Sequence, residues 1–145
     1  MSLPSIMIVD DNEMDRYLLK RYINKSNLAH KVFEAENGEE ALALLNDYST
    51  NREKYPEKFP PILIFLDINM PIMNGFEFLE EFKKIRNNPD VYESIVLTMF
   101  TSSASEEDRV KALNYDFVKD YIVKMPNSSE DLKKTLAKHF PNQIH

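Results

Sequence analysis

The chain has no cysteine and only two glycines, Gly38 and Gly75, among its 145 residues. The absence of cysteine excludes a disulfide framework, a thiolate metal site and a cysteine nucleophile. Long hydrophobic runs are also absent, and runs such as Ile62–Leu66 are far too short to span a bilayer. No secretory signal pattern precedes Pro4, so a cytoplasmic location is the default expectation.

The chain also lacks an excess of positive charge. Its 18 lysines and arginines stand against 24 aspartates and glutamates, which gives a net charge of −6. Phosphate backbones are bound by clustered basic residues, so nucleic acid is not expected as a direct partner. The 43% hydrophobic and 29% charged residues are ordinary for a globular domain, and the length suits one domain rather than two.

What the chain does have is an alternation of short apolar runs with longer segments of helical period. Strands are predicted at Ile6–Val9, Lys31–Glu36, Ile62–Leu66, Ser94–Phe100 and Asp120–Val123. Helices are predicted at Glu13–Ser26, from Gly38, at Asn74–Asn87, from Ser105 and from Ser128. Strands that are continuous in apolar residues and separated by helices predict an α/β fold, a doubly wound parallel sheet with helices on both faces.

The apolar spacing also predicts which helical faces are buried. In the first helix Met14, Leu18 and Tyr22 recur every fourth residue, with Leu19 and Ile23 beside them. In the fourth helical segment the predicted buried residues are Val110, Leu113 and Phe117.

Between the second helix and the third strand lies the polar stretch Ser49–Pro61, which contains three prolines. This stretch is long for a loop inside a compact domain. It is interpreted as a solvated insertion, with a functional lip beside the site as the alternative.

Residues suited to handling phosphate or a hard cation follow four of the predicted strands. Asp10 and Asp11 follow the first strand, Asp67 the third, Thr101 the fourth and Lys124 the fifth. Ligands of open α/β sheets bind beyond the carboxyl ends of the strands, so these side chains are candidates for one site.

Electrostatics indicates what such a site needs. Two carboxylates about 4 Å apart repel by roughly 4 kcal/mol at an effective dielectric of 20. Three carboxylates and one ammonium leave two negative charges, which a divalent cation neutralises. All candidate ligands are oxygens, a set that favours Mg²⁺ over Zn²⁺.

A carboxylate beside such a cation can act as a nucleophile toward phosphorus. Asp67 is the natural candidate, because it ends the most apolar strand and lies between the other groups. Mg²⁺, Lys124 and the Thr101 hydroxyl would then each neutralise one oxygen of the transferred phosphoryl group.

The sequence resembles the receiver domain of two-component response regulators along nearly its whole length. The matching segments are Ile8-Val9-Asp10-Asp11-Asn12, Asp67-Ile68-Asn69-Met70-Pro71-Ile72-Met73-Asn74-Gly75, Thr101-Ser102-Ser103 and Tyr121-Ile122-Val123-Lys124. The resemblance implies a flavodoxin-like fold with strand order 2-1-3-4-5. It also implies that residues 1–145 form a single receiver domain, with a core from about residue 5 to about residue 140 and no output domain.

The resemblance further implies a role for each matching residue of the metal site. Asp67 is the expected phosphoacceptor. Asp11, Asp67 and the backbone carbonyl of Asn69 are the expected Mg²⁺ ligands, and Asp10 supports the metal through water.

Three further roles and the partners are implied in the same way. Lys124 pairs with the phosphoryl group, Thr101 moves to hydrogen-bond it, and Tyr121 is the aromatic switch that then turns inward. The phosphoryl donor is expected to be a histidine kinase or a histidine phosphotransfer protein. The output partner is an unidentified protein that binds the face made by the fourth helix, fifth strand and fifth helix, and a homodimer through that face is an open alternative.

Three other interpretations stay open at this point. A metal-dependent phosphatase of the haloacid dehalogenase type usually has a second aspartate where this chain has Asn69. Flavodoxin-like FMN binding conflicts with the acidic run Asp10–Asp15, which repels phosphate. A receiver-like scaffold without phosphorylation is the third.

One departure from the family also stands out: Met125 separates Lys124 from Pro126, which leaves open whether the Lys124–Met125 bond is cis.

Overall fold

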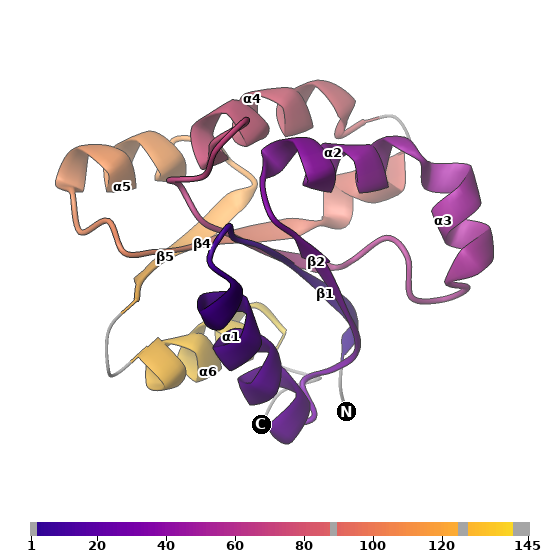
Figure 1. The fold of residues 1–145 in the computed structure, drawn as a ribbon, viewed down its shortest axis with the longest axis horizontal. Coiled ribbons are helices and arrows are strands. Elements are labelled where there is room, and N and C mark those ends of the chain that lie inside the picture. The colour runs from indigo at the N-terminus through magenta and orange to yellow at the C-terminus, as the bar shows by residue number, and fades with distance from the viewer. Residues whose placement is uncertain (1–2, 88–89, 125–127, 141–145) are drawn as a thin grey trace.

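A computed structural model of the chain describes residues 3–87, 90–124 and 128–140, with backbone alone at residues 128 and 129. Five parallel strands form one sheet in the order β2-β1-β3-β4-β5 (Figure 1). The strands are β1 (Leu3–Val9), β2 (Ala29–Ala35), β3 (Leu63–Leu66), β4 (Val96–Thr101) and β5 (Val118–Val123). The fold class and the strand order predicted from the sequence are confirmed.

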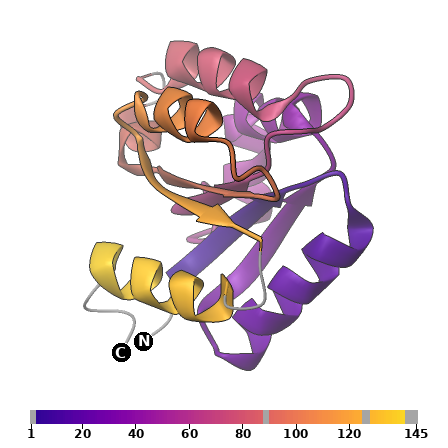
Figure 2. The same ribbon diagram turned by 90° about the vertical axis from the view of Figure 1, so that its left-hand side faces the viewer.

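Helices cover both faces of the sheet (Figures 1 and 2). The helices are α1 (Glu13–Lys25), α2 (Gly38–Asn46), α3 (Tyr48–Lys54), α4 (Gly75–Ile85), α5 (Glu106–Leu113) and α6 (Ser128–His139), with a 3₁₀ turn at Asp90–Ser94. Helices α2, α4 and α5 lie on one face, while α1 and α6 lie on the other. No helix in the described ranges has the length and apolar character needed to cross a membrane.

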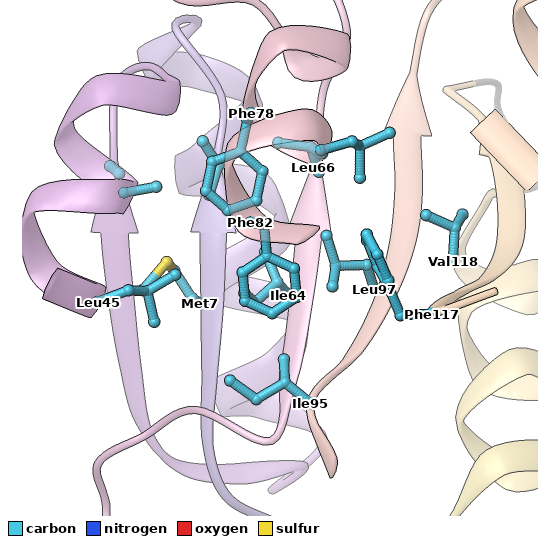
Figure 3. Close-up of a cluster of buried hydrophobic side chains, with 14 of the residues drawn as sticks. Met7, Leu45, Ile64, Leu66, Phe78, Phe82, Ile95, Leu97, Phe117 and Val118 are labelled. Atoms are coloured by element: carbon cyan, nitrogen blue, oxygen red, sulfur yellow. The ribbon is translucent and has the colours of Figure 1, made fainter. Parts of the chain in front are cut away.

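Each strand supplies side chains to two separate cores because successive residues of a strand point to opposite faces. Met7 and Val9 of β1 belong to the core under α2 and α4, whereas Ile6 and Ile8 belong to the core under α1 and α6. In the first core Phe82 is fully buried (Figure 3), which is worth about 1.5–3 kcal/mol relative to an exposed side chain. Burial on both faces explains why the central strands β1 and β3 contain continuous apolar runs.

The predicted buried face of α1 is wrong in part. Met14 and Leu18 are 61% and 53% exposed, whereas Leu19 and Ile23 are buried together with Arg16. The buried stripe is therefore rotated around the helix from the one that the fourfold spacing favoured. The spacing rule finds an amphipathic helix, but two adjacent apolar stripes satisfy it here and packing on the sheet selects one.

The predicted buried face of the helix now defined as α5 also needs a correction. Val110 is 60% exposed, and Ala112 is the buried residue of this helix. Phe117 is buried as predicted, but it lies beyond the end of the helix, just before β5. The helix ends at Leu113, so Phe117 belongs to the connection between α5 and β5 rather than to the helical face that the apolar spacing predicted.

The stretch Ser49–Pro61 is not the solvated loop that the sequence favoured. It contains most of α3, and its Tyr55 and Phe59 side chains pack in the core under α2, while most of its other residues are exposed. Phe59 is buried and packs edge-on against Phe33 of β2, at 5.8 Å between ring centroids. Tyr48 at the start of α3 packs in the same way against Tyr92, at 5.8 Å. The insertion is therefore an aromatic extension of the core.

Helix α4 begins where the chain after β3 folds back on itself. Asn74 caps the helix, because its side chain accepts from the Glu77 N–H at 2.9 Å while the Glu77 carboxylate accepts from the Asn74 N–H at 3.0 Å. Gly75 then donates its N–H to the Ile68 carbonyl at 2.8 Å. A Cβ at Gly75 would lie 2.4 Å from the carbonyl oxygen of Asp67, so only glycine fits.

We predict that Gly75→Ala destabilises the fold by about 1–3 kcal/mol, because backbone must move to admit the methyl group. Urea unfolding measures the loss. Gly38→Ala is the matched comparison, since the atoms nearest to its Cβ would be the flexible side-chain end of Met73, at 2.8 Å and 3.0 Å, with the Phe78 Cβ also at 3.0 Å. Equal losses in the two variants would contradict the close approach at Gly75.

Candidate phosphoacceptor and metal site

The strand order brings the first and third strand ends together. In the pairing of β1 with β3, Val9 lies opposite Leu66, so Asp10 and Asp67 follow on neighbouring strands. The Asp67 N–H donates to the Val9 carbonyl at 2.9 Å, and the Asp10 N–H donates to the Ala35 carbonyl at 3.0 Å. Backbone hydrogen bonds therefore fix the position from which each carboxylate leaves the sheet.

Three carboxylates meet at this edge. Asp10, Asp11 and Asp67 each offer an oxygen that lies within 4.8 Å of the other two. Asp10 and Asp67 are buried, while Asp11 is exposed to solvent. Oxygen ligands alone, one of them open to water, fit a hard divalent cation such as Mg²⁺, which keeps part of its water shell.

Lys124 reaches the same cluster from the end of β5. Its ammonium lies 2.6 Å from Asp10 Oδ2, 3.0 Å from Asp67 Oδ2 and 2.9 Å from Asp15 Oδ2. The Lys124 N–H also donates to the Thr101 carbonyl at 2.8 Å, which ties the end of β5 to the end of β4. The sequence-predicted residues Asp10, Asp67 and Lys124 are thus in direct contact.

Burial sets the charge state of this cluster. Desolvation raises the pKa of Asp10 to about 6, against the opposing hydrogen bonds from Lys124 and from the Asn12 N–H. The pKa of Lys124 is raised as well: its own burial lowers that pKa, but the hydrogen bonds to Asp10 and Asp15 outweigh the burial. The cluster therefore favours the charged form of Lys124, whereas burial disfavours the charged form of Asp10.

Asp67 is oriented by the loop that follows β3. Its Oδ1 accepts the N–H of Ile68 at 2.7 Å, which leaves Oδ2 for Lys124. The loop closes with a tight turn in which the Met73 N–H donates to the Pro71 carbonyl and Ile72 adopts a φ of 69°. A β-branched residue at positive φ is strained, and such strain is typical of functional loops. Asn69, the predicted carbonyl ligand, is exposed in this loop.

The predicted switch residues, Thr101 at the end of β4 and Tyr121 in β5, are both hydrogen-bonded to Ser103. Thr101 is fully buried, and its hydroxyl accepts the Ser103 N–H at 3.2 Å. Tyr121 is also buried, and its hydroxyl donates to the Ser103 carbonyl at 2.9 Å. The side chain of Ser103 in turn donates to Asp108 at 2.6 Å. The Tyr121 side chain is therefore buried and tied to Ser103 in this structure, and its role as a switch stays a prediction.

Two residues at the site were not singled out from the sequence. Asp15 contacts Lys124 from the first turn of α1, and the acidic run in which it lies was the available signal. Arg16 is buried, donates to the Asp10 carbonyl at 2.7 Å and pairs with Glu34 and Glu36. No sequence pattern indicated a buried arginine on this helix.

One open question falls outside the described residues. The Lys124–Met125 bond, whose cis or trans form the sequence left open, includes a residue of the range 125–127. The direction of the Lys124 ammonium is nevertheless given by its three carboxylate contacts.

The family model of the response regulator receiver domain matches residues 6–137. The chain belongs to this family. The match includes every strand-end residue of the site, and it makes the chain a receiver domain, the phosphoacceptor module of two-component signalling. The resemblance stated from the sequence is confirmed.

Individual relatives agree with this assignment. Response regulator Rcp1 of Synechocystis is 29% identical over 88% of this chain and 81% of its own length. Histidine kinase CKI1 of Arabidopsis thaliana is 31% identical over 72% of this chain, which spans only 9% of that kinase. The crystal structure of a two-component response regulator from Cytophaga hutchinsonii superposes with a TM-score of 0.79 at 25% identity, covering 98% of this chain and 100% of that one. The Mn²⁺-bound form of Rcp1 has a TM-score of 0.70 at 24% identity and covers 98% and 97%.

The raised pKa of Asp10 predicts how the stability of the metal-free receiver depends on pH. A carboxyl whose pKa is higher in the folded state contributes stability below about pH 4 that is lost as the pH rises through about 6. A shift of about two pKa units corresponds to about 3 kcal/mol. Asp10→Asn removes this loss, so its advantage over the wild type is expected to be clearly larger at pH 7.5 than at pH 4.5.

Urea unfolding in EDTA at the two pH values measures this difference. The control is Asp116→Asn, which removes an exposed carboxylate far along the chain from the cluster. A stability difference between Asp10→Asn and the wild type that is the same at both pH values would contradict the prediction.

Proposed function

We propose that Asp67 accepts a phosphoryl group from a phosphohistidine, with Mg²⁺ bound by Asp10, Asp11, Asp67 and the Asn69 carbonyl. The observation that carries this proposal is the contact of a buried strand-end carboxylate with Lys124 beside two further carboxylates. An aspartate with an ammonium on one side and metal ligands on the other is suited to attack at phosphorus.

The transfer forms one bond and breaks one. An oxygen of the Asp67 carboxylate attacks phosphorus, the bond between phosphorus and the donor's imidazole nitrogen breaks, and that nitrogen keeps the electron pair and takes a proton. Lys124 and the Thr101 hydroxyl donate hydrogen bonds to the oxygens of the transferred group. Mg²⁺, when bound, neutralises the negative charge that accumulates on those oxygens.

Receiver domains of this family take their phosphoryl group from histidine kinases or histidine phosphotransfer proteins, and we assign the same class of donor to this chain. The new acyl phosphate replaces one negative charge with about two. This change favours an altered packing of Thr101 and Tyr121 against Ser103, and so biases the surface formed by α5, β5 and α6. That surface is the proposed binding site for a protein partner or a second copy of the chain.

Replacing the acceptor tests the proposal directly. Asp67→Asn is expected to abolish labelling by acetyl phosphate in the presence of Mg²⁺, because the amide is not a nucleophile toward phosphorus. Labelling is measured on phosphate-affinity gels, and loss of the label in hydroxylamine identifies an acyl phosphate. Asp47→Asn, which changes an exposed aspartate outside the cluster, should label normally. Undiminished labelling of Asp67→Asn would refute the assignment.

Metal dependence gives a second test. Chelation by EDTA is expected to stop the labelling of the wild type, and Asp11→Asn is expected to raise the Mg²⁺ concentration for half-maximal labelling by about tenfold or more, because a charged ligand is lost. The control is Asp116→Asn, which removes an exposed carboxylate that lies outside the cluster. Labelling that is independent of Mg²⁺ would overturn the metal assignment.

A further inference from the structure

The Lys124 ammonium has as many carboxylate partners as it has protons. It contacts Asp10, Asp67 and Asp15 at 2.6 Å, 3.0 Å and 2.9 Å. An ammonium group has three N–H donors, so the three contacts use all of them. Any new acceptor at the site, such as a phosphoryl oxygen, must therefore take the place of one of these partners.

Asp15 differs from the other two partners. Asp10 and Asp67 belong to the group of oxygens that can hold a metal ion, and Asp15 does not. The Asp15 side chain is 35% exposed, whereas those of Asp10 and Asp67 are 4% and 9% exposed. Asp15 thus contacts the ammonium from the solvent side and from another element, helix α1.

The first turn of α1 holds Asp15 in place. Asn12 caps the helix, and its side chain accepts the Asp15 N–H at 2.9 Å. The adjacent cation, Arg16, binds the Asp10 carbonyl, Glu34 and Glu36. The charge of Arg16 is therefore used elsewhere, and the Asp15 carboxylate is left to Lys124.

Binding of a divalent cation changes the balance among the three partners. Asp10 and Asp67 would offer oxygens to the ion, and the ion would repel the Lys124 ammonium because the ion and the ammonium are both positive. Phosphorylation then removes negative charge from the Asp67 carboxylate oxygens themselves. Neither metal binding nor phosphorylation uses the Asp15 carboxylate, so its charge stays available to Lys124.

We propose that Asp15 is a positioning residue that keeps the Lys124 ammonium at the site while the other two carboxylates bind metal and phosphoryl group. This inference rests on the proposed function, since it concerns the approach of Lys124 to the group on Asp67. Asp15 contacts neither the metal nor the phosphoryl group and acts only through Lys124.

The rate constant for labelling by acetyl phosphate at saturating Mg²⁺ tests the role of Asp15. Asp15→Asn is expected to lower it about tenfold, because Lys124 loses the partner that holds it against the ion. Asp15→Glu is expected to retain most of the rate, since it restores the charge on a longer side chain. A rate for Asp15→Asn equal to or above that of the wild type would overturn the proposal.

The matched control is Glu13→Gln, which removes a charge from the same exposed first turn of α1. It should label at the wild-type rate if the effect belongs to the contact with Lys124 rather than to helix electrostatics. A double-mutant cycle with Lys124→Ala separates the routes further. In the Lys124→Ala background, Asp15→Asn should cause no additional loss, and a second tenfold loss there would contradict action through Lys124.

A structural readout completes the test without any phosphorylation. The NMR signal of the Lys124 Nζ group, recorded with and without Mg²⁺, is expected to shift in Asp15→Asn and to stay at its wild-type position in Glu13→Gln. An unchanged signal in Asp15→Asn would overturn the inference. Failure of the wild type to label would instead count against the proposed function, so the two failures are distinguishable.

Discussion

Carboxylates of like charge lie close together around a single ammonium at the carboxyl edge of the sheet, and the properties of the site follow from this arrangement. Asp10 and Asp67 are buried beside each other because their strands pair in register, and Lys124 lies between them. Burial of the Asp10 carboxyl is the main cause of its raised pKa, and the nearby charge of Asp67 raises it further. Two apolar cores, one on each face of the sheet, supply the stability that keeps such a site folded.

The cost at the site is also what makes it responsive. A cluster that carries uncompensated negative charge suits a small divalent cation, and in the proposed function such a cation would prepare Asp67 for an incoming phosphoryl group. A change of charge at any of these carboxylates acts on Lys124, because Lys124 contacts the carboxylates that follow β1 and β3 and the one on α1. The contacts that hold this cluster together are therefore the same ones that the proposed switching would change.

Most of the fold and the central site residues could be predicted from the sequence, for one physical reason. Strands buried on both faces are continuous apolar runs, so their ends are visible, and the residues after those ends share one edge of a parallel sheet. Asp10, Asp67, Thr101 and Lys124 were predicted in this way. Local pattern could not reveal contacts between distant segments, such as Tyr92 against Tyr48 or Phe33 against Phe59, so α3 was taken for a solvated loop.

The errors on the helices have a related cause. Met14 and Leu18 fit an amphipathic spacing as well as Leu19 and Ile23 do, and only packing on the sheet decides between the two stripes. That rotation also turns Arg16 inward and aims Asp15 at Lys124. The two site residues missed from the sequence were therefore missed together with the orientation of their helix.

Ser103 joins three parts of the molecule through three different atoms. Its amide binds the Thr101 hydroxyl, its carbonyl accepts from Tyr121, and its own hydroxyl binds Asp108. Thr101 is consequently linked to Tyr121 of β5 and to Asp108 of α5 through a single residue. The loop between β4 and α5 therefore provides a continuous hydrogen-bonded path from the carboxyl edge of the sheet to the surface of α5 and β5.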